Sequence, residues 1–300
     1  MKVLLTGVTG FVGEAIERHL LSRGYEVFGV HARQRTPEPG NDRRNTVLDI
    51  GSISAVEKLR AVMSPCDFII HAAVSMNMDL FANEVTHTNC AGVQNLLWLA
   101  EQWQTERFVF LSSVPVIGTP RQKPVTESHT TEPLTSYHAS KLFGEHLVSL
   151  AAKRNISGVS LRLSAPVGPR MPRSRLLPML VTRALSQRPL ELAGTGSRKQ
   201  NYVDVRDIAK ACELSFSSDV SGVVNIASSD CIANLDLARR CIAMCGSTSE
   251  IVFTGREDFE EGIVWDISID KAKKSLGYVP EFNVDDMISQ LIAALADGKQ

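Results

Sequence analysis

The chain has 300 residues, of which 44% are hydrophobic and 22% are charged, and its formal net charge is -1. This composition excludes a disordered or fibrous chain, and the near-neutral charge gives no electrostatic reason to expect a nucleic acid or an anionic membrane as partner. No apolar run approaches the ~20 residues that a membrane span needs, and the opening apolar run is too short for a signal-peptide core.

The cysteines fit a reducing compartment. Without a signal peptide, we expect all of them to be reduced in a cytoplasmic protein: Cys66, Cys90, Cys212, Cys231, Cys241 and Cys245. Cys241 and Cys245 would share one helix face, but no matching pair of histidines or cysteines follows them. Packing is therefore favoured over a metal or redox pair, and no metal site is predicted.

The first half of the chain alternates short apolar runs with amphipathic ones. The patterns predict strands at 2–6, 26–32, 46–50, 67–73, 107–113 and 158–164, and helices at 11–24, 54–63, 91–103 and 135–154. Repeated strand–helix–strand units predict an α/β fold with a doubly wound parallel sheet, the Rossmann arrangement, with helices on both faces.

The second half is less regular. Helices are predicted at 174–187 and 235–246, a strand running into a helix at 201–216, and a helix that stops at Gly277. We expect residues 1–165, rejoined by about 201–226, to form the large NAD(P)-binding domain. Residues 166–200 and 227–300 are expected to form a smaller α/β lobe that binds the substrate.

Gly7, Gly10 and Gly13 lie where the first strand passes into the first helix. Gly7 can adopt a turn conformation that a side chain would forbid, Gly10 lets a ligand approach the backbone, and Gly13 lets the helix pack on the sheet. The helix N-terminus then offers N–H groups and partial positive charge to a pyrophosphate. The spacing is G-x-x-G-x-x-G, but its strand–turn–helix context favours a dinucleotide site over a purely structural turn.

The end of the second strand bears on the choice between NAD and NADP. An acidic residue there would bind the ribose hydroxyls of NAD, whereas this chain has His31, followed by Arg33 and Arg35. A guanidinium can pair with a 2′-phosphate, so NADP is slightly favoured, unless these arginines are simply solvated loop charges. Asp49 is either an adenine ligand or an ordinary aspartate at a strand end.

Tyr137 and Lys141 are four residues apart in a predicted helix, which puts them on one face. A free phenol has a pKa near ~10, and a nearby ammonium would favour its phenolate and bring it into working range. Ser113 ends the preceding strand, at the sheet edge where ligands bind, and would orient a substrate oxygen. Y-x-x-x-K alone is a weak signal, but its combination with the glycine turn and this serine predicts a catalytic site.

Together these motifs resemble the extended short-chain dehydrogenase/reductase superfamily, in its sugar-nucleotide epimerase/dehydratase branch. The resemblance runs through "TGVTGFVG", "IIHAAV", "LSSVPVIG", "SYHASK", "LRLSAPVGPR" and "NYVDVRDIAKA". It implies that Ser113, Tyr137 and Lys141 are catalytic, and that Asn89 supports Lys141 from behind. It implies cofactor contacts at Gly7, Gly10, Phe11, Val12, Gly13, Asp49, Ile50, Ala72, Ala73, Val74, Asn89, Tyr137, Lys141 and Pro166, and substrate contacts at Ser112, Ser113, Arg198 and Gln200.

The chain departs from the family pattern at positions that would contact the substrate. Ile117 stands where members often have tyrosine, and Ala165 replaces an asparagine. Gln200 stands where an arginine often clamps the substrate diphosphate, with Arg198 two residues away as a replacement. The arginines from 170 to 175 would form a phosphate clamp with Arg198, or else are solubilising charge.

Several reactions share this machinery. A 4,6-dehydratase of the family carries an Asp–Glu pair where this chain has Val114 and Pro115, so dehydration is set aside. A 4-epimerase, which usually prefers NAD, and an NADPH-dependent 4-ketoreductase both remain. The alternatives are a reductase of a non-sugar ketone and a non-catalytic NADP-binding sensor. The resemblance also implies a homodimer through the helices around 95–103 and 137–148.

Overall fold

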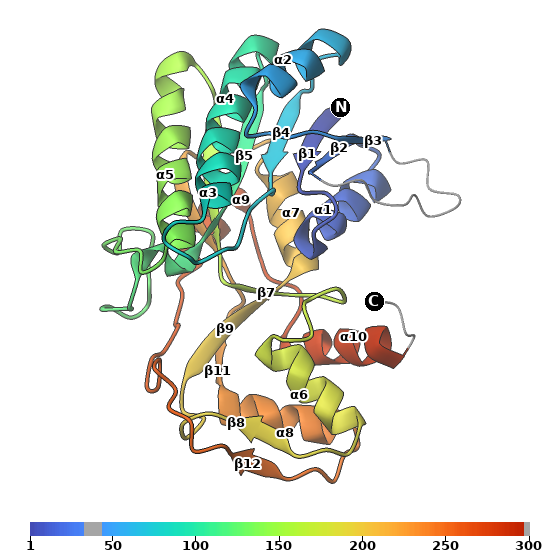
Figure 1. Ribbon diagram of the computed structural model, residues 1–300, viewed down its shortest axis with the longest axis vertical. Coiled ribbons are helices and arrows are strands. Elements are labelled where there is room, and N and C mark those ends of the chain that lie inside the picture. Colours follow the sequence, from blue (N-terminus) through green and yellow to red (C-terminus); the bar gives the residue numbers. More distant parts are fainter. Residues whose placement is uncertain (33–43, 297–300) are drawn as a thin grey trace.

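The computed structural model describes residues 1–32 and 44–296. Within these ranges a parallel sheet of seven strands forms in the order β10-β6-β5-β4-β1-β2-β3, which confirms the predicted doubly wound arrangement (Figure 1). Its strands are β1 (Lys2–Thr6), β2 (Glu26–His31), β3 (Arg44–Val47), β4 (Phe68–His71), β5 (Arg107–Ser113), β6 (Gly158–Leu163) and β10 (Gly222–Ile226).

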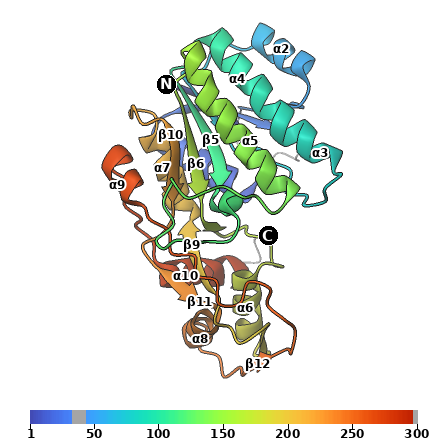
Figure 2. The ribbon, with the colours of Figure 1, turned by 90° about the vertical axis from the view of Figure 1, so that its left-hand side faces the viewer.

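Helices cover both faces of this sheet (Figures 1 and 2). One apolar core joins the sheet to α1 (Phe11–Ser22), α7 (Val205–Leu214) and α9 (Asp270–Leu276), and another joins it to α2 (Ile53–Val62), α4 (Gly92–Trp103) and α5 (Ser136–Ala151). The spacing of apolar residues explains the packing. In α4, the buried Val93, Leu96 and Ala100 recur at helical intervals and face the sheet.

Short irregular helices connect some of these elements. The three-residue helix α3 (Asn83–Val85) runs into the π-helix η1 (Thr86–Ala91), which leads directly into α4. The 3-10 helix η2 (Val114–Ile117) follows β5, and a second 3-10 turn, η3 (Ala152–Arg154), extends α5. The sequence patterns did not predict the π-helix.

A smaller part of the molecule lies below the large sheet in Figure 1. It contains a sheet in the order β11-β9-β7 and the pair β12-β8, packed with three helices around a third apolar core. These elements are β7 (Ala165–Val167), β8 (Leu190–Leu192), β9 (Lys199–Asp204), β11 (Cys231–Ala233), β12 (Ile251–Phe253), α6 (Leu176–Leu185), α8 (Asn234–Met244) and α10 (Val284–Ala296). Although β9 pairs here, α7 and β10 return to the large sheet. The exact domain boundaries stay a prediction.

The structure also bears on membrane-spanning helices, cysteines and metal binding. None of the helices in residues 1–32 and 44–296 has the length and apolarity to cross a membrane. All the cysteines of the chain lie in these ranges and are free thiols. The same ranges contain no cluster of His, Cys, Asp and Glu that could hold a metal ion.

Asp207, in the first turn of α7, ties this helix to the segment that follows α9. Its carboxylate accepts hydrogen bonds from the backbone N–H groups of Glu281 (3.0 Å) and Phe282 (3.2 Å). Burial raises the pKa of Asp207 from 3.8 to about 6, although these two hydrogen bonds oppose the rise. The folded protein therefore holds the Asp207 proton more tightly than the unfolded chain does.

We expect this group to make the protein less stable as the pH rises from about 4 to about 6. Its contribution to the free energy of unfolding is fully present below the unfolded pKa and is lost as the pH passes the folded pKa. Asp207→Asn keeps an acceptor oxygen and removes the titration. The Tm of the wild type minus that of Asp207→Asn should fall across this window and stay constant above about pH 7. A difference that does not change with pH would contradict the assignment.

Candidate functional site

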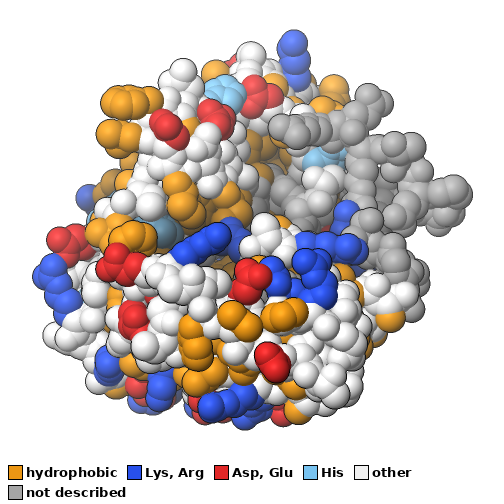
Figure 3. Space-filling model, turned by 60° about the horizontal axis from the view of Figure 1, so that its bottom comes forward, with side chains coloured by type: hydrophobic (Ala, Val, Ile, Leu, Met, Phe, Trp, Pro, Cys, Tyr) orange, Lys and Arg blue, Asp and Glu red, His pale blue; other side chains and the backbone are white. Residues whose placement is uncertain are grey.

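The sequence-predicted site residues gather at one edge of the large sheet. Gly7 follows β1, Ala72 to Val74 follow β4, Ser113 ends β5, and Pro166 lies just beyond β6. Because these parallel strands all end at the same edge, the residues lie where ligands bind in doubly wound folds. Figure 3 shows Lys and Arg side chains in a band across the middle of one face of the molecule.

The glycine turn leaves no room for side chains at two of its positions. Gly7 has φ of +73°, and a Cβ there would lie 2.6 Å from the backbone nitrogen of Ala73. A Cβ on Gly13 would lie 2.1 Å from the carbonyl oxygen of Gly7. That same oxygen accepts a hydrogen bond from the Gly10 N–H at 2.9 Å. The start of α1 therefore lies directly against the turn.

The N-terminus of α1 is open to a ligand from the side of the turn. Gly10 is the N-cap residue and provides no side chain to accept the first N–H groups of the helix. Phe11 packs against the core of the smaller part, and Val12 packs against the core of the large sheet. A glycine turn beside helix N–H groups that the N-cap residue leaves uncapped fits the pyrophosphate of a dinucleotide.

The residues predicted to contact the adenosine part of the dinucleotide lie at the ends of β2 and β3. His31 is a buried residue at the end of β2, while Arg33 and Arg35 lie outside the described residues. The Asp49 carboxylate accepts the Gly51 N–H at 3.0 Å and lies 2.9 Å from Nε2 of His87, a partner that the sequence patterns did not indicate. Ile50 is buried in the core.

Tyr137 and Ser113 come together across α5 and β5. Tyr137 is half-buried in the first turn of α5, which the Thr135 hydroxyl caps by accepting the His138 N–H at 3.2 Å. Burial raises the pKa of the Tyr137 phenol above its ordinary value, while its hydrogen bond to Ser113 and the charge of Arg175 act in the opposite direction. Arg175 is the N-cap residue of α6, in the smaller part.

Lys141 lies one helical turn beyond Tyr137 and is fully buried. Its Nζ donates to the carbonyl oxygen of Leu111 at 2.7 Å and lies 4.8 Å from the centre of the Phe110 ring. Burial lowers the pKa of Lys141 to about 7, and the carboxylate of Glu145 opposes this shift. The sequence predicts that Lys141 depresses the pKa of Tyr137. In this arrangement the ammonium is bonded to β5, and the cation that lowers the phenol pKa is Arg175.

Asn89 joins the segment after β4 to α5. Its amide oxygen accepts the Ser75 N–H at 2.7 Å, and its amide nitrogen donates to the Ser140 hydroxyl at 2.8 Å. Ser140 in turn donates to the carbonyl oxygen of Tyr137 at 2.7 Å. The amide of Asn89 thus contacts the residue before Lys141 rather than its ammonium. Asn89 lies in the π-helix, a distortion frequent at functional sites.

The structure corrects the assignment of Ser112 to the substrate. Ser112 is only 3% exposed, and its hydroxyl donates to Oε1 of Glu145 at 2.5 Å. Because side chains alternate along a strand, Ser112 points away from the face that Ser113 presents. The contact with Glu145 was not apparent in the sequence.

The two substrate residues predicted on and before β9 lie next to acidic groups. Arg198 forms ion pairs with Glu260 and with Asp258, the latter at 3.8 Å. Its Nη2 also lies 3.5 Å from Oε1 of Gln200. The Arg198 charge is therefore already balanced by two carboxylates. Among the other arginines proposed for a phosphate clamp, Arg170 pairs with Glu14 of α1.

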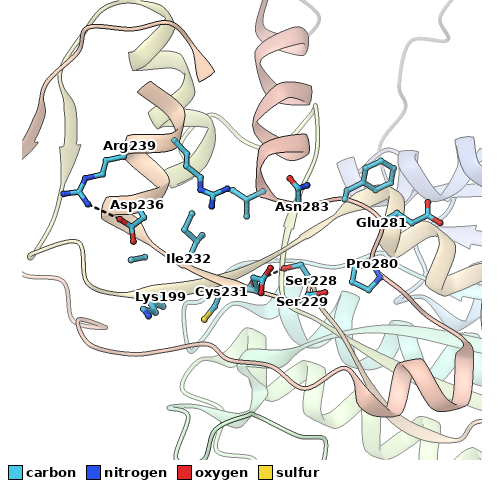
Figure 4. A pocket seen from close by; sticks show the side chains of 15 residues that line it. Lys199, Ser228, Ser229, Cys231, Ile232, Asp236, Arg239, Pro280, Glu281 and Asn283 are labelled. Atoms are coloured by element: carbon cyan, nitrogen blue, oxygen red, sulfur yellow. Dashed lines mark hydrogen bonds and ion pairs between the residues drawn. The ribbon is translucent and has the colours of Figure 1, made fainter. Parts of the chain in front are cut away.

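Two cavities lie away from Tyr137. A groove of about 680 Å³ opens between β9, β11, α8 and the segment 280–284 (Figure 4). Its rim includes Arg239, which pairs with Asp236 at 3.1 Å. A cavity of about 330 Å³ is lined by α1, α7 and residues near Pro169, and it includes Phe11. Ser113, Tyr137 and Lys141 are not among the residues that line either one within the described chain.

Comparisons with known proteins show which family the chain resembles. The model of the NAD dependent epimerase/dehydratase family matches residues 3–227. The chain is 28% identical to the low-salt glycan biosynthesis protein Agl12 of Haloferax volcanii, over 95% of this chain and 96% of the relative. It is 24% identical to a dTDP-glucose 4,6-dehydratase of Streptomyces niveus, over 100% of this chain and 94% of the relative.

Solved structures share the fold along the whole chain. The UDP-glucose 4-epimerase of Thermotoga maritima, solved with UDP-glucose, has a TM-score of 0.89 at 20% identity, covering 100% of both chains. A UDP-glucose 4-epimerase of Thermus thermophilus in complex with NAD has a TM-score of 0.85 at 23% identity, covering 99% of each. The resemblance and the enzyme class predicted from the motifs are confirmed: the chain belongs to the NAD dependent epimerase/dehydratase family of extended short-chain dehydrogenase/reductase enzymes.

Proposed function

We propose that this enzyme moves hydride between a nicotinamide dinucleotide and a carbon of a nucleotide-activated sugar that carries a hydroxyl or ketone. The observation that carries the proposal is the placement of Ser113, Tyr137 and Lys141 at the sheet edge that also holds the glycine turn. When bound, the dinucleotide would supply or accept the hydride at the reacting carbon.

The residues proposed to bind the dinucleotide lie mostly at the ends of successive strands of the large sheet. The backbone of Gly7, Gly10 and Gly13, with Phe11 and Val12, would hold the pyrophosphate against α1. The groups proposed along the rest of the dinucleotide are His31, Arg33, Asp49, Ile50, Ala72, Ala73, Val74, Asn89 and Pro166. The neighbouring epimerase solved with NAD supports a nicotinamide cofactor. The slight preference for NADP that His31 and Arg33 suggest stays a proposal.

The side chains of the site would transfer one proton to or from the substrate. Tyr137 would donate its phenolic proton to the substrate oxygen when the ketone is reduced, and take it back when the alcohol is oxidised. Ser113, which hydrogen bonds to Tyr137, would orient that oxygen. Arg175 would supply positive charge that favours the phenolate.

A 4-epimerase and a 4-ketoreductase fit this arrangement best. Val114 is 1% exposed and opens η2 together with Pro115, and neither side chain can exchange a proton. The extra acid and base of a dehydratase are therefore not supplied at the positions where the family carries them. The two favoured reactions differ in the fate of the hydride. An epimerase would take it from the sugar carbon and return it to the other face of the ketone, whereas a ketoreductase would transfer it once from the dinucleotide and release an alcohol.

The test has two parts. Mass spectrometry of the dinucleotide that co-purifies should detect NAD(H) or NADP(H), with retained NAD(H) favouring the epimerase and loosely held NADP(H) the reductase. A panel of UDP-, dTDP- and GDP-sugars and their 4-keto forms should then give an epimer or a reduced product. Dinucleotide binding without turnover of any sugar or ketone would favour a non-catalytic sensor and refute the proposal.

One observation favours a second candidate, the reduction of a non-sugar ketone. Arg198 is already paired with Asp258 and Glu260, and Gln200 and Ala165 stand where a nucleotide sugar would meet an arginine and an asparagine. Neutralised arginines attract a diphosphate less strongly. UDP, dTDP and GDP should compete with a nucleotide-sugar substrate and should not affect the reduction of a simple ketone.

We also propose that the enzyme forms a homodimer through α4 and α5. A line of exposed residues at helical spacing runs along α5, through Ala139, Phe143, His146 and Leu150. Phe143 and Leu150 are 40% and 52% exposed. Pairing with a second copy would bury these apolar side chains.

A further inference from the structure

A buried cluster of charged groups lies behind the Tyr137–Lys141 pair. The side chains of Glu145, on α5, and Arg162, on β6, are only 5% and 3% exposed. Arg162 donates from Nε to Oε1 of Glu145 at 2.8 Å and from Nη2 to Oε2 at 2.7 Å. The Ser112 hydroxyl adds a third hydrogen bond to Oε1 at 2.5 Å. All three donors point at the two oxygens, which suits a carboxylate because it only accepts hydrogen bonds.

Stability alone does not explain this cluster. Taking two opposite charges out of water costs about as much as their attraction returns, and apolar residues of the same volume often replace such pairs without loss of stability. The side chains are nevertheless held in a single geometry by the fork of Arg162, which donates through two nitrogens at once. The fixed position of the Glu145 carboxylate therefore calls for an explanation other than stability.

The neighbour of that charge is Lys141, one turn earlier on α5. The titratable groups around Lys141 are Glu145 and Tyr137 on its own helix and His71 on β4, while Arg162 on β6 is paired with Glu145. Burial and the Lys141 charge lower the pKa of His71 to about 3, so His71 is neutral at neutral pH. Among the described residues, Glu145 is the charged group that favours the charged form of Lys141.

We propose that Glu145 is a positioning residue: fixed by Arg162 and Ser112, it supplies the negative charge that keeps the Lys141 ammonium charged beside Tyr137. The direction of the lysine shift agrees with this, because burial lowers the pKa of Lys141 to about 7 and Glu145 raises it. Without Glu145, Lys141 would be mostly neutral at pH 7. The consequence for turnover depends on the function proposed above, whereas the coupling between the two charges does not.

The test measures Lys141 itself. In protein carrying ¹³C-labelled lysine, the Lys141 signal is assigned by its loss in Lys141→Met and followed through a pH titration. In Glu145→Gln the midpoint should drop by about one pH unit or more, the effect of removing an opposite charge at this range. If a substrate is turned over, the alkaline limb of kcat should move the same way, with kcat at pH 8 falling about tenfold.

Two further variants make the result decisive. Glu101→Gln removes a carboxylate that pairs with Arg154 at 2.6 Å on the surface, and it should leave the Lys141 midpoint unchanged. If Glu145→Gln does not fold, the double variant with Glu145→Met and Arg162→Met removes the whole pair at similar volume. It should lower the midpoint in the same direction but by less, because the Arg162 charge, which opposes that of Glu145, is removed with it.

The outcomes separate this inference from the proposed function. An unchanged Lys141 midpoint in a folded Glu145 variant overturns the inference, whether or not the protein turns over a sugar. A lowered midpoint supports it. If the wild type then turns over none of the sugars or ketones offered, that result counts against the proposed function and leaves the coupling between Glu145 and Lys141 in place.

Discussion

Replacing Tyr137 with phenylalanine is expected to lower kcat by about 10²- to 10⁴-fold while the protein still folds and binds its dinucleotide. The change removes only the phenolic hydroxyl, which hydrogen bonds to Ser113, and keeps the ring that packs 5.0 Å from His138 between centroids. Because burial raises the pKa of Tyr137, the phenol is protonated at neutral pH and ready to donate to a ketone oxygen. Steady-state turnover and NAD(P)H fluorescence titration measure the two quantities separately.

Tyr25→Phe is the matched control. Tyr25 is also half-buried, and its ring packs against Phe216 with centroids 5.5 Å apart, away from the candidate site. Because Tyr25 lies away from the candidate site, loss of its hydroxyl should leave kcat within about twofold of the wild-type value. Full activity in Tyr137→Phe would remove the tyrosine from the mechanism, and equal losses in both variants would point to a general effect on folding.

Replacing Gly13 with valine should abolish dinucleotide binding and destabilise the large sheet. Even the Cβ would lie 2.1 Å from the carbonyl oxygen and 2.8 Å from the carbonyl carbon of Gly7, and backbone atoms cannot move aside as a flexible side chain does. The start of α1 would have to move away from the turn, which is overpacking that costs at least about 1–3 kcal/mol. Thermal unfolding reports the loss of stability, and the amount of co-purified dinucleotide reports the loss of binding.

Gly24→Ala, beyond the other end of α1, distinguishes a binding defect from simple destabilisation. Gly24 also has a positive φ, of +81°, but a Cβ there meets no atom within 4 Å. This variant should lose about 1 kcal/mol of stability from backbone strain and keep its dinucleotide. If Gly13→Val retained as much dinucleotide as Gly24→Ala does, the glycine turn would not be the pyrophosphate site.

The first half of the fold could be predicted because its strands and helices are long enough to show their periods. The strand β5 occupies 107–113, the range predicted, and the patterns placed α4 and α5 within a few residues of their ends. The strand predicted at 46–50 lies earlier in the chain, since β3 spans Arg44–Val47 and the Asp49 carboxylate accepts the Gly51 N–H in a turn.

The smaller part was harder to predict for a physical reason. The strands β7, β8, β11 and β12 have three residues each, fewer than a period-two pattern needs to stand out from chance. They are stabilised by pairing with distant segments, as β8 is by β12, and pairing of this kind leaves no local signal in the sequence. The helix α10 is amphipathic, but it follows an irregular stretch and the sequence patterns do not predict it.

At the candidate site, residue type and spacing predicted Ser113, Tyr137 and Lys141 together, and the structure brings them to one sheet edge, where their roles stay proposals. Local patterns could not indicate Arg175 or Glu145, because their effects on Tyr137 and Lys141 depend on how distant elements pack. Ser112 was different. The alternation along β5 already implied that two consecutive serines face opposite sides, so this error was avoidable.

The core of the smaller part is assembled from two stretches of chain, and this limits how the protein can be recombined. Val167 to Tyr202 supply one side of that core and Leu237 to Leu291 the other, while the intervening α7 and β10 belong to the large sheet. A chimera that inherits new specificity from a homologue must therefore exchange both stretches at once. A single-crossover graft would join half of one parent's core to half of the other's and lose their complementary packing.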